Sequence, residues 1–179
     1  MVKSGEKIGT WAYDYKKGHH SYGDWTFAGN GSGALDSSVK YAGASSYRSI
    51  PHTIYSYGTN TLSRNSFSCQ QLRVILWARA VVTAAWITVS IRHPSYGDLN
   101  IIYTNGTVDW TKFRVSFWYD SASNVRLGRI ESWNGSSWIQ VGSDTNFGTG
   151  SPSADTVVLK VYGTNASTAW FDELEVYAA

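Results

Sequence analysis

Residues 72–79 read LRVILWAR, and residues 112–119 read KFRVSFWY. Apolar side chains take every second position of the first segment: Leu72, Val74, Leu76 and Ala78. The intervening positions include Arg73, Trp77 and Arg79. The second segment alternates in the same way, with Phe113, Val115, Phe117 and Tyr119 against Lys112, Arg114, Ser116 and Trp118. Because successive side chains of a β-strand point to opposite faces, both segments predict strands with one face in a core.

The same alternation recurs along the chain. Ile87, Val89 and Ile91 alternate with Trp86, Thr88, Ser90 and Arg92. Leu99, Ile101 and Tyr103 also occupy every second position of their segment. Asn134-Gly135 between two apolar runs predicts a hairpin. Further strands are expected at Val157–Val161 and Trp170–Tyr177, and short ones around Trp11–Tyr15, Trp25–Ala28, Val39–Tyr41 and Tyr47–Ile50. Roughly ten short strands predict an all-β fold, a two-sheet antiparallel β-sandwich with jelly-roll topology, in a single domain over residues 1–179.

Composition excludes several classes of protein. With 179 residues and a formal net charge of +2, the chain is too weakly basic to bind nucleic acid through phosphate neutralisation. The single cysteine, Cys69, permits no intrachain disulfide. The sequence has no apolar run of about 18 residues, so no membrane insertion is expected. Its polar N-terminus shows no secretory signal, so the chain is either made without one or is an excised domain. We expect an extracellular or surface-exposed location, on a virion or a cell.

Three segments resemble a known family. Residues 39–48, VKYAGASSYR, resemble an early strand of carbohydrate-binding-module jelly rolls, and residues 169–177, AWFDELEVY, resemble their last strand. Residues 109–115, DWTKFRV, are similar to a strand shared by these modules and concanavalin A-like lectin domains. The resemblance implies a jelly-roll fold. In those modules the aspartate that matches Asp172 often helps to hold a structural Ca²⁺, which suits oxygen ligands.

Several large aromatic and basic side chains lie at the alternate strand positions that are predicted to point away from the core. They are Trp77, Trp86, Trp118, Arg73, Arg79, Arg92 and Arg114. Indole rings stack on the C–H faces of sugars, and arginine binds hydroxyls or carboxylates. If these strands are neighbours in one sheet, they form an aromatic and basic platform for a glycan, and the arginines favour an acidic or otherwise polyhydroxylated one. The alternative is structural: Trp and Arg stack on each other and cover the sheet beneath a loop or another subunit.

Two further sets of residues are candidates. Trp133 and Trp138 flank the Asn134-Gly135 turn, either as a cross-strand pair or as ligand-stacking residues at a loop tip. Asp172 shares its phase with Trp170, Leu174 and Val176, which we assign to the core. A carboxylate there needs a partner, because burying an unpaired charge is costly. Its partner is then a structural Ca²⁺ or an arginine, unless the residue is simply exposed at the strand end.

Three functions remain open. The first is a non-catalytic carbohydrate-binding, lectin-like module that stacks a polysaccharide or glycan on sheet-face tryptophans. The second is a structural or adhesive subunit of a virion, fibre or cell-surface assembly, in which exposed aromatics form a homo-oligomer interface. The third is a polysaccharide-degrading enzyme, for which Glu131 and Asp120 are the best pair of carboxylates. The sequence does not identify the glycan.

Overall fold

The computed structural model describes residues 12–17, 26–29, 31–52, 58–64, 71–83, 85–152, 157–164 and 166–178. All the regular structure in these ranges is β-strand. The strands are β1 (Ala12–Lys17), β2 (Thr26–Gly29), β3 (Gly31–Asp36), β4 (Ser46–Pro51), β5 (Gly58–Arg64), β6 (Gln71–Val82), β7 (Ile87–His93), β8 (Gly97–Thr104), β9 (Val108–Asp120), β10 (Val125–Trp133), β11 (Trp138–Gln140), β12 (Thr145–Thr149), β13 (Val157–Gly163) and β14 (Ser167–Ala178).

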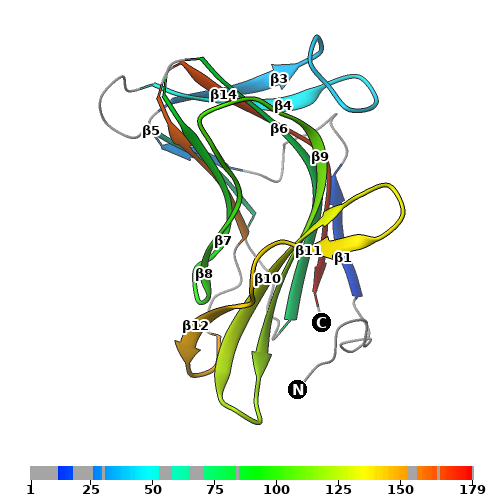
Figure 1. The fold of residues 1–179 in the computed structure, drawn as a ribbon, viewed down its shortest axis with the longest axis vertical. Helices are drawn as coiled ribbons and strands as arrows, with labels where there is room; N and C mark the ends of the chain where they lie inside the picture. Colours follow the sequence, from blue (N-terminus) through cyan, green and yellow to red (C-terminus); the bar gives the residue numbers. More distant parts are fainter. Residues whose placement is uncertain are drawn as a thin grey trace.

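The strands form two antiparallel sheets (Figure 1). The larger sheet has nine strands, in the order β11-β10-β9-β6-β14-β4-β3, with β1 also paired to β14 and β12 to β10. The smaller sheet has five strands, in the order β2-β5-β13-β7-β8. Figure 1 shows β7 and β8 lying across from β6 and β9. The predicted two-sheet antiparallel sandwich is therefore confirmed, while its jelly-roll connectivity stays a prediction.

The alternation of side chains creates the core between the sheets. In β6 the residues Leu72, Val74, Leu76, Ala78 and Ala80 are at most 1% exposed, and the residues between them are half-buried. Phe113, Val115 and Phe117 of β9 and Ile87, Val89 and Ile91 of β7 are buried in the same cluster. Each fully buried apolar side chain contributes roughly 1.5–3 kcal/mol, so the sandwich rests on this alternation.

A β-bulge in β14 corrects one predicted phase. Asp172 pairs with Trp77 and Glu175 pairs with Ile75, so β14 carries an extra residue against β6 between these two pairs. Glu173, inside the bulge, has a φ of 48°. Directly paired residues share a face, so Asp172 lies with Trp77 on the outer face, the face turned away from the smaller sheet. Trp170 pairs with Arg79 on that outer face too, so the assignment of Asp172 and Trp170 to the core phase was wrong.

A second irregularity lies between β7 and β8. The pairing shifts between Val89 and Ser90. Val89 pairs with Ile102, whereas Ser90 pairs with Asn100. The extra residue in β8 is Ile101, and both Ile101 and Ile102 are buried. Leu99, Ile101 and Tyr103 occupy every second position, but because of the extra residue they do not all lie on one face of the sheet. Tyr103 is 75% exposed.

The N-terminal strands were predicted with mixed success. The expected strands near Trp11–Tyr15, Trp25–Ala28 and Tyr47–Ile50 correspond to β1, β2 and β4, although Trp11 and Trp25 themselves lie outside the described residues. Val39–Tyr41 is not a strand but part of the loop 37–45 between β3 and β4. Cys69 lies outside the described residues. No helix in the described part of the chain is long and apolar enough to cross a membrane.

Gly163 gives a test of how the smaller sheet is packed. A Cβ at this position would lie 2.8 Å from the Trp86 carbonyl oxygen and 3.3 Å from Ser167 Cβ. We expect Gly163→Ala to lower the free energy of unfolding by about 1–3 kcal/mol, because backbone must move to admit the methyl group. Gly106→Ala is the control, since its nearest neighbour would be Thr104 Oγ1 at 3.8 Å. Urea unfolding measures both, and equal stability of the two variants would contradict this account.

Candidate functional site

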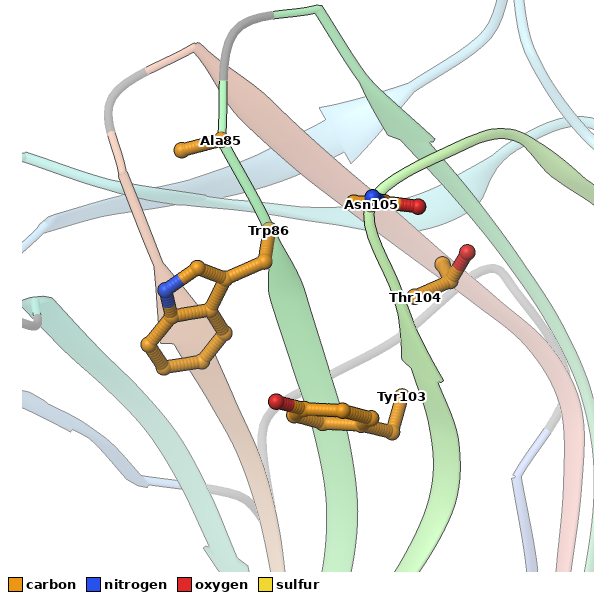
Figure 2. A pocket seen from close by; sticks show the side chains of 5 residues that line it. All are labelled: Ala85, Trp86, Tyr103, Thr104 and Asn105. Carbon is orange, nitrogen blue, oxygen red and sulfur yellow. The ribbon is translucent and has the colours of Figure 1, made fainter.

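An open pocket lies where β7 begins and β8 ends. It has a volume of about 490 Å³ and is lined by Ala85, Trp86, Tyr103, Thr104 and Asn105. We call it the Trp86–Tyr103 pocket (Figure 2). The centroids of the Trp86 and Tyr103 rings are 6.1 Å apart, and their planes are inclined by 42°. The described lining contains two aromatic rings, a hydroxyl and an amide, and no charged group.

The two aromatic residues are positioned by different devices. The Trp86 carbonyl accepts a hydrogen bond from the Ser167 hydroxyl at 3.2 Å, and Gly163 lets the chains approach closely beside it. Tyr103 reaches the surface because of the extra residue in β8, which turns its ring away from the core. Figure 2 shows both rings beside β7 and β8, with Asn105 at the end of the strand. The pocket therefore combines a residue whose backbone is held by close packing with a ring exposed by a bulge.

The predicted platform of three tryptophans does not form in one sheet. Trp77 in β6 and Trp118 in β9 belong to the nine-stranded sheet, whereas Trp86 precedes β7 in the five-stranded sheet. Arg92 is separated from the other arginines in the same way, and its Nε lies 3.7 Å from Asp98 Oδ1. Sequence alternation places a side chain on a face of its strand but does not say to which sheet that strand belongs.

Trp77 is covered by the loop 37–45. The ring of Tyr41 stacks on it with centroids 3.6 Å apart and planes inclined by 17°. Lys112 Nζ lies 6.0 Å from the centroid of Trp77 and 5.8 Å from that of Trp138. One face of the Trp77 ring is therefore occupied by Tyr41, as the structural alternative for this residue expected.

Trp118 and the outer-face arginines are also engaged within the protein. Trp118 is 6% exposed, and the Arg129 guanidinium lies 5.5 Å from its ring centroid. Arg114 forms a two-pronged hydrogen-bonded ion pair with Glu131 and lies 4.6 Å from the centroid of Trp138. Arg79 lies 3.6 Å from Asp109 and 5.5 Å from the ring centroid of Trp170. Burial lowers the pKa of Arg73, with a further contribution from Arg114.

Trp133 and Trp138 are a cross-strand pair. They are directly opposite in β10 and β11, with ring centroids 5.4 Å apart. Asn134 Oδ1 accepts hydrogen bonds from the backbone N–H groups of Ser136 and Ser137, which fixes the turn between them. The hairpin prediction is confirmed.

Glu131 and Asp120 do not form a catalytic pair. Glu131 pairs with Arg114 of β9, and Asp120 lies at the far end of the same strand. At the rise per residue of an extended strand, Asp120 is roughly 20 Å from Arg114 and therefore from Glu131. The two carboxylates of a typical glycosidase are only about 5–9.5 Å apart. Both oxygens of Glu131 are also bonded to Arg114.

Asp172 anchors the loop 37–45 to the sheet. It is 2% exposed, and its Oδ2 accepts hydrogen bonds from the backbone N–H groups of Tyr41 at 2.9 Å and Ala42 at 3.1 Å. Its Oδ1 accepts one from the N–H of Glu173 at 2.9 Å. In the described ranges no three His, Cys, Asp or Glu side chains form a group that could hold a metal ion. In the described residues Asp172 therefore serves as an acceptor for backbone N–H groups, and its role as a Ca²⁺ ligand stays a prediction.

Sequence reasoning missed Tyr103 and Tyr41. Tyr103 was placed in the phase of Leu99 and Ile101, and only an unusual pairing in β8 reveals its exposure. Tyr41 was placed in a strand. The signal that could have found it is the polar, glycine-containing segment around it, which is more typical of a loop than of a strand.

Comparison with known proteins shows the fold. No family model matches the sequence, and no curated protein matches it. Among solved structures, the VIP36 exoplasmic/lumenal domain in its Ca²⁺-bound form is similar with a TM-score of 0.52 at 7% identity, covering 87% of this chain and 84% of that chain. The two proteins share a β-sandwich fold. The resemblance stated from the sequence is confirmed as a likeness of fold.

Two further structures are similar over most of their length. Cellulose induced protein, Cip1, has a TM-score of 0.56 at 15% identity, covering 91% of this chain and 96% of that chain. A xylan-binding domain of carbohydrate-binding module family 22 has a TM-score of 0.48 at 13% identity, covering 94% of this chain and 96% of that chain. At 15% identity the likeness to Cip1 is one of fold.

Asp172→Ala tests the loop anchor. We expect the variant to lose about 1–3 kcal/mol of stability, because the backbone N–H groups of Tyr41, Ala42 and Glu173 lose their acceptor. Amide hydrogen exchange at Tyr41 and Ala42 should become markedly faster. Asp172→Asn, which keeps one acceptor oxygen, should show a smaller effect on both measurements. Unchanged protection of these two amides in Asp172→Ala would refute the anchor.

The carboxylate of Asp36 predicts a pH dependence of stability. Trp170 Nε1 donates a hydrogen bond to Asp36 Oδ2 at 2.9 Å, and this bond is the main cause that lowers the pKa of Asp36 below its ordinary value of 3.8. The N–H groups of Ser38 and Val39 also donate to its Oδ1. A carboxyl with a depressed pKa in the folded state stabilises above the ordinary pKa and loses that contribution as pH falls through the folded value.

We therefore expect the stability difference between the wild type and Asp36→Asn to shrink as pH falls from about 5 to about 2. Urea unfolding at a series of pH values measures it. A difference that stays constant over this range would show that the charge of Asp36 does not contribute.

Proposed function

We propose that this chain is a glycan-binding domain in which a neutral sugar ring packs on the joined aromatic surface of Trp86 and Tyr103. The observation that carries the proposal is the pocket itself: two accessible aromatic rings beside a hydroxyl and an amide, on a lectin-like β-sandwich. Sugar rings have apolar C–H faces that pack on aromatic rings, and hydroxyl groups that need hydrogen-bond partners at the edge. The volume of about 490 Å³ lies within the range of ligand pockets.

The charge of the lining favours a neutral glycan. None of the residues described around the pocket is ionisable near neutral pH. The arginines that led us to favour an acidic ligand lie elsewhere, and Arg79, Arg92 and Arg114 face carboxylates of the protein. An uncompensated carboxylate of a uronic acid would lose hydration in this pocket without gaining a cationic partner.

The angle between the rings favours a soluble chain over a crystalline surface. Two rings inclined by 42° cannot both lie flat against one planar array of sugars. Together they form a bent surface that two successive units of a twisted chain can follow. The proposed ligand is therefore a free oligosaccharide or a soluble polysaccharide.

Isothermal titration calorimetry tests the proposal. The probes are neutral trisaccharides of glucose, xylose, mannose and galactose, with a trisaccharide of galacturonic acid for comparison. We expect binding of at least one neutral probe, and a loss of about tenfold or more in affinity in Trp86→Ala and Tyr103→Ala, because each removes a stacking surface.

Two variants serve as controls. Tyr103→Phe keeps the ring and should retain most of the affinity. Tyr119→Ala removes an aromatic residue of β9, whose hydroxyl bonds Asn124, and should bind like the wild type. Full affinity in both Trp86→Ala and Tyr103→Ala would refute this site, and preferential binding of the galacturonic acid probe would refute the neutral ligand.

A further inference from the structure

A second pocket lies on the outer face of the nine-stranded sheet. It has a volume of about 330 Å³ and is lined by Tyr41, Ala42, Ile75, Trp77, Lys112, Glu173 and Glu175. We call it the Tyr41–Trp77 pocket. Its lining comes from the loop 37–45 and from β6, β9 and β14. It shares no described residue with the Trp86–Tyr103 pocket.

Tyr41 presents a rigid aromatic surface to this pocket. Its ring stacks on Trp77, and its backbone N–H is bonded to the buried carboxylate of Asp172. The residue is nevertheless 45% exposed. Trp110 contacts its ring edge-on, with centroids 6.1 Å apart. An exposed ring that is already held on one face loses little conformational entropy when a ligand packs on it, which is the condition for favourable stacking.

The polar groups of the pocket suit the hydroxyls of a sugar. The bulge in β14 brings both Glu173 and Glu175 to the lining, although strict alternation across Asp172 would turn Glu173 toward the core. Tyr177 donates a hydrogen bond from its hydroxyl to Glu175 Oε2 at 2.8 Å. Carboxylates accept hydrogen bonds from hydroxyl groups and the Lys112 ammonium donates them, so these three residues can bind adjacent hydroxyls of one ring.

The two pockets face different directions. Trp77 and Lys112 lie on the face of the nine-stranded sheet that is turned away from the core, and Trp86 and Tyr103 belong to the five-stranded sheet. The buried layer between the sheets separates them. One glycan ring cannot contact both aromatic pairs, so two occupied pockets mean two separate glycan segments.

We propose that the Tyr41–Trp77 pocket is a second sugar-binding site. One molecule of the protein would then bind two glycan segments at once and cross-link them. The inference rests on the proposed function of the Trp86–Tyr103 pocket. Two linked sites also raise the apparent affinity for a polymer above that for a short oligosaccharide, because the second binding event becomes intramolecular.

The experiment compares single-site variants with the wild type. Calorimetry with the neutral trisaccharides should give about two sites per chain in the wild type and about one in Tyr41→Ala or Tyr103→Ala, each of which weakens one site by about tenfold or more. Glu173→Gln should weaken the same site as Tyr41→Ala without removing the stacked ring that covers Trp77. Circular dichroism and unfolding curves establish that each variant is folded.

Turbidity and light scattering then test cross-linking. The probes are soluble polymers of glucose, xylose, mannose and galactose, with protein first shown to be monomeric at the concentration used. The wild type should cross-link the polymer whose trisaccharide it binds, and Tyr41→Ala and Tyr103→Ala should each abolish cross-linking while keeping one site.

The outcomes separate the two proposals. If Tyr103→Ala abolishes all binding and Tyr41→Ala and Glu173→Gln change nothing, the second site is refuted and the proposed function stands. If Tyr41→Ala abolishes all binding and Tyr103→Ala changes nothing, the assignment of the first pocket fails and cross-linking is refuted. If no probe binds, both are refuted. Two sites in the wild type, one in each variant and cross-linking only in the wild type support the inference.

Discussion

The pairing of β6 with β9 on one side and β14 on the other fixes the rest of the structure. Every second residue of β6 is buried, and its neighbours keep their own apolar residues on the same face. A shift of one residue in either pairing would turn a whole set of side chains from the core to solvent, so the register is strongly specified. The described positions of Trp77, Lys112 and Asp172 on one outer face follow from this register alone.

Both candidate pockets lie where the regular alternation is interrupted. The extra residue in β8 exposes Tyr103, and the extra residue in β14 brings Glu173 beside Glu175. Bulges are frequent near functional sites because they redirect one side chain while the remaining pairing holds the strand. In this chain the two bulges lie in different sheets, which is why their pockets are separate.

The sequence predicted features that depend on the two-residue alternation of side chains. It did not predict features that depend on which strands are hydrogen-bonded and in which register. The core faces of β6, β7 and β9 follow from the alternation, as does the hairpin around Asn134-Gly135. The phase of Trp170 and Tyr103 could not be predicted, because an extra residue in a strand leaves no mark on composition. The separation of Trp86 from Trp77 could not be predicted either, because it depends on which strands are hydrogen-bonded neighbours. The cation–π packing of the outer face was anticipated as an alternative, and Arg129 over Trp118 is an example.

The partners of β10 have a consequence for association between chains. Residues 125–128 of β10 pair with β12, and residues 131–133 pair with β11. Two short strands thus cover this side of β10 in place of one long strand. Long, continuous sheet edges are templates for pairing with strands of other molecules, and short or interrupted edges are poor ones. This side of β10, covered by two short strands, is therefore a poor template for edge-to-edge pairing with another chain.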